Sequence, residues 1–241
     1  MPRRPLVVLH NAVSMDGSTA GAPVDIGLFY RAAASIGAGA MLVGSRTATA
    51  GITMFGGNVP AEGPADFRPP PERRCDRRPC WFIVDSRGAL RGSLHVLRRS
   101  GLCRDVVIVV SRSTPRRYIE HLRRRGYGYI TAGTRRVDLR RALERIALRY
   151  GVKTVQVDSG GRLAGILLQQ GLADRISLVV SPTIVGKDAT PLFRDMVPRH
   201  VVPLRLLSHR RLDRGHLHLM YAVAGTRSKD RLRTSPVRSH G

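Results

Sequence analysis

The feature that most limits how this chain can fold is the alternation of short apolar runs with amphipathic segments. Runs such as residues 106–110, VVIVV, are nearly continuous in apolar character, which is typical of strands buried on both faces. Amphipathic segments such as residues 137–151 have the helical period. Near the end, residues 202–224 contain two strand patterns separated only by a turn at DRG. This order predicts an α/β fold in three layers, with a mostly parallel central sheet and an antiparallel C-terminal hairpin.

The same patterns predict the individual elements. Strands are expected over residues 5–10, 40–45, 81–85, 105–111, 127–131, 152–158 and 173–186. Helices are expected over 26–38, 115–126, 137–151 and 162–171, with Asp25 as the first N-cap and Gly151 as a C-terminal stop. Residues 51–80 are rich in glycine, proline and charge, and are expected to form a long loop.

No shift in composition divides the patterned part of the chain. We therefore expect one domain over residues 1–225 and a disordered basic tail over residues 226–241, which have no periodicity. Hydrophobic residues make up 42% of the chain, which is enough for a core. No apolar run approaches the ~20 residues of a membrane-spanning helix, so a cytoplasmic protein is expected.

The net charge of +24 raises the possibility of a nucleic-acid-binding protein. However, the arginines are scattered over what are predicted to be exposed helix faces. Aromatic residues make up only 5%, so stacking platforms for single strands are scarce. The charge is expected to attract phosphorylated ligands, with nonspecific nucleic-acid binding as a side effect.

The cysteines and histidines give no clear metal motif. Cys75, Cys80 and Cys103 lack C-x-x-C or zinc-like spacing, so we predict free thiols and no metal site. His216 and His218 would lie on one face of a strand, and a metal pair there is left open as the less favoured alternative.

Small and hydroxyl-bearing residues follow several predicted strands, where parallel sheets bind ligands. In VDSGG, Gly160 and Gly161 allow the backbone to approach a ligand, and a helix beginning near Arg162 would direct its free N–H groups at an anion. In DSRG, Ser86 and Arg87 suit a phosphomonoester such as the 2′-phosphate of NADP. The alternative in both places is an ordinary turn.

Five stretches together are more specific than any one loop: AVSMDG (12–17), AMLVGSRT (40–47), FIVDS (82–86), VDSGGRLAGILLQQGLADRI (157–176) and SPTIVG (181–186). In order and spacing, the chain resembles the pyrimidine reductase family of riboflavin biosynthesis, which has a dihydrofolate-reductase-like fold and is often fused to a deaminase. The resemblance implies a reductase domain that uses NADPH to convert a ribosylaminopyrimidine 5′-phosphate into its ribityl form. It also suggests a homodimer.

The resemblance assigns roles to individual residues. Asp158 stands where the family places an acid, usually glutamate, against the substrate, and it would orient the substrate or stabilise an iminium. Asp16 is a second acid expected near the substrate, although it could be only a turn residue. The expected NADPH contacts are Ala12, Thr47, Ser86, Arg87, Gly160, Gly161, Arg162, Leu163, Ala164, Gly165 and Ile166.

The chain also departs from the family pattern. Gly51 replaces the first acid of the family's substrate-binding segment, and Arg68 is only a candidate for its arginine. No H-x-E with P-C-x-x-C occurs, so a stand-alone reductase is expected, with any deamination done by another protein. Two alternatives stay open: a same-fold NADPH reductase of another pterin-like or pyrimidine substrate, and a basic nucleic-acid-associated protein without catalysis.

Overall fold

A computed structural model describes residues 4–56, 59–71, 76–193 and 201–225. The expected tail over 226–241 and Cys75 lie outside these residues. The strands of the sheet are β1 (Leu6–Val13), β2 (Ala40–Gly44), β3 (Cys80–Val84), β4 (Val106–Val110), β5 (Gly128–Thr131), β6 (Thr154–Val157), β7 (Arg175–Val180), β8 (Leu204–Arg211) and β9 (Leu217–Val223). The helices are α1 (Ile26–Ala34), α2 (Ser45–Gly56), α3 (Leu94–Arg99), α4 (Arg116–Arg124), α5 (Leu139–Tyr150) and α6 (Gly161–Gln169).

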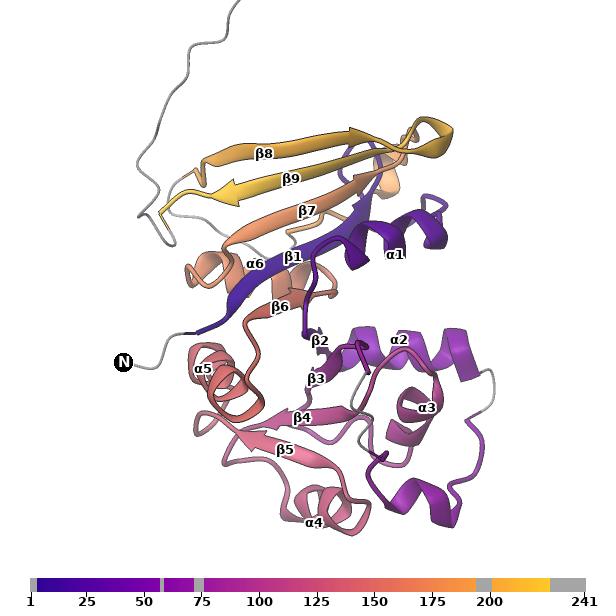
Figure 1. The fold of residues 1–241 in the computed structure, drawn as a ribbon, viewed down its shortest axis with the longest axis vertical. Helices are drawn as coiled ribbons and strands as arrows, with labels where there is room; N and C mark the ends of the chain where they lie inside the picture. Colours follow the sequence, from indigo (N-terminus) through magenta and orange to yellow (C-terminus); the bar gives the residue numbers. More distant parts are fainter. Residues whose placement is uncertain (1–3, 57–58, 72–75, 194–200, 226–241) are drawn as a thin grey trace, which may run out of the picture.

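The strands form one sheet in the order β5-β4-β3-β2-β6-β1-β7-β9-β8 (Figure 1). From β5 to β7 every neighbouring pair is parallel, whereas β9 is antiparallel to both β7 and β8. The predicted α/β fold, with its mostly parallel sheet and antiparallel C-terminal hairpin, is therefore confirmed. The chain moves outward from β2 to β5 and then returns to insert β6 between β2 and β1.

Helices cover both faces of the sheet (Figure 1). On one face, α5 and α6 pack through residues such as Leu143 and Leu167. On the other, α2, α3 and α4 contribute Ile52, Leu97 and Leu122 to a second core. On that second face α1 packs over β1 and β7, while α2 packs over β2 and β3.

Local sequence signals set several helix ends as predicted. The Asp25 carboxylate accepts a hydrogen bond from the Leu28 N–H and caps α1. Asp138 caps α5 in the same way, and Gly151 ends that helix with a positive φ of 64°. The predicted ends at Asp25 and Gly151 are confirmed, because each depends on residues within one turn of the helix, whereas the cap at Asp138 was not among the predictions.

One prediction about local structure was wrong in part, and one helix was missed. Residues 51–56, expected in a loop, belong to α2, and Pro64–Phe67 form a 3₁₀ turn. Thr and Gly lower the helix propensity of TATAGITMFG, but Ala48 and Ile52, one turn apart, bury against the sheet and stabilise the helix. The six-residue α3 was not predicted at all, because it is too short to show a period.

Among the described residues, no helix combines the length and apolar character needed to cross a membrane. Cys80 and Cys103 are buried free thiols, as expected for these two cysteines.

Candidate active site at the carboxyl edge of the sheet

The predicted site residues follow the carboxyl ends of four adjacent strands, β3, β2, β6 and β1. Ser86 and Arg87 follow β3, and Thr47 follows β2 within α2. The segment from Asp158 onward follows β6, and Ala12 lies at the end of β1. Three inter-strand spacings of ~4.8 Å place the outer members about 14 Å apart. The fold therefore arranges these loops in one row along one edge.

The turn from β6 into α6 leaves the helix N-terminus open. Gly160 is the N-cap of α6, and no side chain caps the helix. A Cβ built on Gly160 would meet no atom within 4 Å, so the space on that side of the N-cap is open. The uncapped N–H groups and the positive end of a nine-residue helix make this a suitable place for an anion.

The rest of the predicted 160–166 stretch lies differently along α6. Arg162 is exposed, but Ala164 and Gly165 are buried against the sheet. Ile166 is 38% exposed, one turn further into the helix. The first residues of the stretch thus face the open N-terminus, while the later ones lie in the body of the helix.

Hydrogen bonds join the loops after β1, β2 and β6. The Thr47 Oγ1 accepts from the Gly160 N–H at 3.3 Å and lies 3.3 Å from the Ser159 Oγ. The Ser159 Oγ in turn accepts from the Gly44 N–H at 3.3 Å. From β1, the Asn11 side-chain amide donates to the Ser159 carbonyl at 3.2 Å. Neither Ser159 nor Asn11 was predicted as a site residue from the sequence, although Ser159 lies inside the VDSGG motif.

The DSRG turn after β3 is held by its buried aspartate. Asp85 accepts from the backbone N–H groups of Gly88, Ala89 and Leu90 and from the Tyr118 hydroxyl. Ser86 is half-buried and Arg87 exposed. Within the described part of the chain, neither side chain has a hydrogen bond or ion pair. The turn therefore presents a hydroxyl and a guanidinium that are available to a ligand.

Asp158 lies just past the end of β6 and is partly exposed. Burial raises the pKa of its carboxyl to about 6. Tyr30 of α1 is half-buried, and its pKa is raised first by burial and then by the charge of Asp158. Asp158 thus faces the side of the sheet that carries α1, and its carboxyl gains a proton only about one unit below neutral pH.

Asp16 is hydrogen-bonded to other residues of the protein. Its carboxylate accepts from the Ser14 hydroxyl at 2.5 Å, and from the N–H groups of Val185 and Gly186. Hydrogen bonds from Ser14 and then Gly186 lower its pKa to about 2. Asp16 thereby ties the loop after β1 to the loop after β7, and its contact with a substrate stays a prediction.

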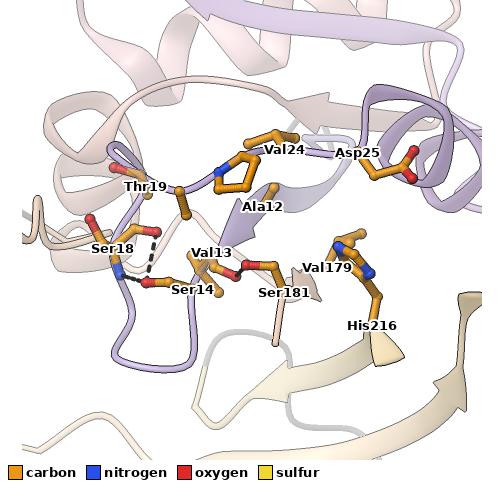
Figure 2. A pocket seen from close by; sticks show the side chains of 12 residues that line it. Ala12, Val13, Ser14, Ser18, Thr19, Val24, Asp25, Val179, Ser181 and His216 are labelled. Atoms are coloured by element: carbon orange, nitrogen blue, oxygen red, sulfur yellow. Dashed lines mark hydrogen bonds between the residues drawn. The ribbon is translucent and has the colours of Figure 1, made fainter. Parts of the chain in front are cut away.

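A small pocket lies beside this loop at the carboxyl ends of β1 and β7 (Figure 2). Ala12, Asp25 and His216 line it together with several hydroxyl side chains. These hydroxyls are hydrogen-bonded within the protein. The Ser18 Oγ donates to the Ala20 carbonyl, and the Ser181 Oγ donates to the Val13 carbonyl. The pocket widens the site at Ala12 without offering free hydroxyl donors.

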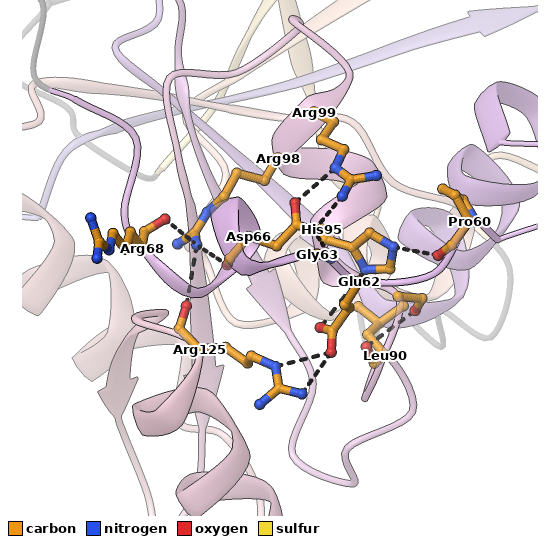
Figure 3. Close-up of polar contacts among 11 residues, drawn as sticks. Pro60, Glu62, Gly63, Asp66, Arg68, Leu90, His95, Arg98, Arg99 and Arg125 are labelled. Atoms are coloured by element: carbon orange, nitrogen blue, oxygen red, sulfur yellow. Dashed lines mark hydrogen bonds and ion pairs between the residues drawn. The ribbon is translucent and has the colours of Figure 1, made fainter.

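The candidate Arg68 lies in a segment held by α3 and α4 (Figure 3). The Arg98 guanidinium of α3 donates to the carbonyls of Asp66 and Arg68. Arg99 pairs with Asp66, and Arg125, which follows α4, pairs with Glu62. Because these contacts attach residues 62–68 to the outer half of the molecule, Arg68 is not brought together with Asp158.

The two histidines left open as a metal pair have other partners. The His216 Nδ1 donates to the Asp213 carbonyl, whereas His218 bonds to Ser177 and Arg210. Among the residues that the structure describes, no three His, Cys, Asp or Glu side chains are grouped to hold a metal ion.

Among the known proteins that match this chain by sequence are a reductase and a riboflavin biosynthesis protein. A 2,5-diamino-6-ribosylamino-4(3H)-pyrimidinone 5′-phosphate reductase of Methanothermobacter thermautotrophicus is 35% identical over 115 residues, covering 47% of this chain and 51% of that protein. The riboflavin biosynthesis protein RibD of Chlamydia muridarum is 26% identical over 205 residues, covering 80% and 50%. The chain therefore spans about half the length of these relatives.

Solved structures show the same fold. Acinetobacter baumannii RibD has a TM-score of 0.62 at 20% identity, covering 91% of this chain and 58% of that one. The riboflavin biosynthesis reductase Rib7 of Saccharomyces cerevisiae has a TM-score of 0.64 at 18% identity, covering 92% and 90%. The model of the RibD C-terminal domain matches residues 5–218, so the chain belongs to the RibD C-terminal domain family.

Proposed function

We propose that this protein is an NADPH-dependent reductase that converts a ribosylaminopyrimidine 5′-phosphate into its ribityl form. The observation that carries the proposal is the row of loops after β3, β2, β6 and β1, along which candidate contacts for the adenosine phosphate, the diphosphate and the nicotinamide follow one another in that order on one edge of the sheet. The chain's family and its 35% identity to a named reductase support the reaction class. NADPH, when bound, would supply a hydride to the former ribosyl carbon.

The residues fit the cofactor along this row. Ser86 and Arg87 would hold the 2′-phosphate of the adenosine, because an arginine and a hydroxyl both donate to phosphate oxygens. The backbone at Gly160 and Gly161 would hold the diphosphate in front of α6. The nicotinamide end would then lie near Ala12, beside the pocket of Figure 2.

Asp158 would act on the substrate as a proton donor. Opening the ribose breaks the bond between the anomeric carbon and the ring oxygen, and that oxygen must take up a proton. A carboxyl with a pKa of about 6 can deliver a proton near neutral pH and is then left as an anion beside the iminium carbon. The hydride would complete the reduction at that carbon.

The direct test is to incubate the purified protein with NADPH and the ribosylaminopyrimidine phosphate. We expect NADPH oxidation and a ribityl product two mass units heavier, identified by mass spectrometry. The variant Asp158→Asn should bind NADPH and form little product. NADPH binding without product would leave a cofactor-binding protein with another substrate, and the absence of both would reject the proposal.

The position of residues 62–68 favours a test of more than one substrate. These residues are fixed against α3 and α4, so the candidate Arg68 lies outside the row of loops and the substrate specificity is left to be tested. The reaction should therefore be run with the 2,5-diamino compound, with its deaminated counterpart and with a dihydropterin. Faster turnover of the dihydropterin would favour the alternative of a same-fold reductase with another substrate.

We further propose that the protein forms a homodimer through the β8–β9 hairpin. Leu204 and Leu206 lie opposite Val223 and Tyr221, so these four side chains share one face. Leu204 and Leu206 are 43% and 46% exposed, whereas Val223 and Tyr221 pack with the core on the face of the sheet that carries α5 and α6. Burial of this apolar face in a second copy would remove it from water.

The oligomeric state can be measured by light scattering after size-exclusion chromatography. Leu206→Glu should convert a dimer into a monomer. The control Arg205→Glu, on the opposite face of the same strand, should leave it a dimer. A wild-type monomer would contradict the proposal.

Nonspecific nucleic-acid binding stays a prediction from the charge of +24. We expect RNA affinity to fall steeply with salt while NADPH binding persists. Salt-resistant, sequence-selective RNA binding with little NADPH affinity would instead favour the nucleic-acid alternative.

A further inference from the structure

Gln156 of β6 is a buried polar side chain. It is only 4% exposed, and its buried side-chain nitrogen has no hydrogen-bond partner within the described residues. Its neighbours in the sheet at the same level are Val8 of β1 and Met41 of β2, both apolar and buried. A buried amide among apolar side chains is unfavourable unless it is hydrogen-bonded. The described residues provide no such partner for the Gln156 nitrogen.

Gln156 points to the same face of the sheet as Asp158. Side chains two residues apart on a strand share a face and lie about 7 Å apart along it. On this face, α1 packs over β1 and β7 and α2 over β2 and β3, so β6 lies between the two helices. Asp158 and the half-buried Tyr30 form the rim of this region, and Gln156 lies one step deeper.

We propose that Gln156 is a ligand-binding residue whose side-chain amide pairs with a planar amide group, an N–H beside a C=O, on a molecule bound next to Asp158. A side-chain amide offers a donor and an acceptor side by side, which matches such a group with two hydrogen bonds. The inference rests on the proposed function. Two molecules of that reaction carry the group: the pyrimidine, in its ring, and NADPH, in its nicotinamide carboxamide.

The variants Gln156→Leu and Gln156→Met remove the amide and keep its approximate volume. Because they place an apolar side chain between Val8 and Met41, we expect the melting temperature of the free protein to stay the same or rise. Gln169→Leu is the matched control, since Gln169 is exposed at the end of α6. A lower melting temperature in both Gln156 variants would show that the amide has a partner within the protein and would overturn the proposal.

Ligand binding then separates the two sources of the planar amide. The dissociation constant of NADPH is measured by calorimetry, and kcat and KM are measured for the pyrimidine phosphate. A rise in KM of about ten- to a hundredfold with unchanged NADPH binding supports contact with the pyrimidine ring. A loss of similar size in NADPH binding supports contact with the nicotinamide.

The remaining outcomes count against the inference. If the wild type binds NADPH and turns over the pyrimidine, but both Gln156 variants match Gln169→Leu in both measurements, Gln156 touches neither ligand. The proposed function survives that result. If the wild type binds neither ligand, both the proposed function and this inference are rejected.

Discussion

The Thr47 hydroxyl oxygen lies 3.3 Å from the backbone nitrogen of Gly160, joining the start of α2 to the N-cap of α6. The two residues follow adjacent strands, β2 and β6, but are far apart in the sequence. This contact sets the position of the open helix end relative to the rest of the row of loops. It therefore bears directly on the proposed diphosphate site.

Thr47→Val keeps the shape of the side chain and removes its hydroxyl. We expect NADPH affinity to fall by about three- to tenfold, in keeping with the loss of one hydrogen bond that orders the loop. Thr49→Val is the control, because the Thr49 hydroxyl donates only to a carbonyl within α2. Equal NADPH affinities by calorimetry for both variants would show that Thr47 does not order the site.

Ser86 and Arg87 are expected to distinguish NADPH from NADH. Replacing them together, as Ser86→Asp and Arg87→Glu, places negative charge where the 2′-phosphate would lie and should weaken NADPH far more than NADH. Arg117→Glu, on the exposed surface of α4, controls for the charge reversal at Arg87. The ratio of the two dissociation constants is the readout, and equal losses for both cofactors would contradict the assignment.

We expect Asp158 to be needed for activity and to lower the free energy of unfolding at high pH. Its native pKa of about 6 lies above the ordinary value of 3.8, so the native protein binds this proton more tightly than the unfolded chain. The stability that the native protein gains from binding this proton is fully present below pH ~4 and is lost as the pH rises through 6. Asp158→Asn should therefore stabilise the protein at pH 8 but not at pH 4, in denaturant titrations.

The same variant should reduce kcat by about 10²–10⁴-fold, the range for a removed general acid. Unchanged turnover, or a variant that is less stable at pH 8, would show that Asp158 is not an acid whose pKa is raised by burial.

A chain of buried hydrogen bonds predicts acid sensitivity. Arg210 lies 3.1 Å from His218, His218 lies 2.8 Å from Ser177, and Ser177 lies 2.9 Å from His10. The chain ends where His10 donates to the Phe29 carbonyl. Since arginine can only donate and a carbonyl can only accept, every bond runs in one direction and both histidines are neutral.

Burial lowers the pKa of His10 to about 4, and burial and then Arg210 lower that of His218. As the pH falls, these histidines therefore take up protons in the unfolded chain before they do so in the native protein. The free energy of unfolding should fall as the pH drops from ~6.5 to 4. The loss from His10 should reach about 3 kcal/mol. Ser177→Ala should be less stable by about 2–4 kcal/mol at pH 7.5, because it leaves a nitrogen unpaired on each histidine. A flat profile between pH 7 and 4.5 would refute the neutral chain.

Arg98 should be needed for the packing of residues 62–68. Its guanidinium pairs with Asp105, donates to four backbone carbonyls and stacks 3.9 Å over the Tyr127 ring. Arg98→Lys cannot replace this set of donors and should lower the free energy of unfolding by about 1–3 kcal/mol. NADPH affinity should not change, and the exposed Arg91→Lys should have no effect on either quantity.

The sequence alone determined the strands of the sheet, the helices α1, α4, α5 and α6, the helix ends at Asp25 and Gly151, and the glycine-rich turn at the end of β6. These features depend on neighbouring residues, on the period of the apolar side chains and on motifs that lie within single loops. The resemblance to a reductase family could also be stated from such motifs, and the family was confirmed.

Only the tertiary structure decided which loops lie together. The insertion of β6 between β2 and β1 brings Thr47 to Gly160 and Asn11 to Ser159, and the order of strands in a sheet is set by packing over the whole chain. Tertiary packing also stabilises α2 as a helix despite its low helix propensity, and it holds Arg68 apart from Asp158. The unpaired amide of Gln156 became visible only once its neighbours Val8 and Met41 were known, because the burial of a side chain depends on strands distant in the sequence.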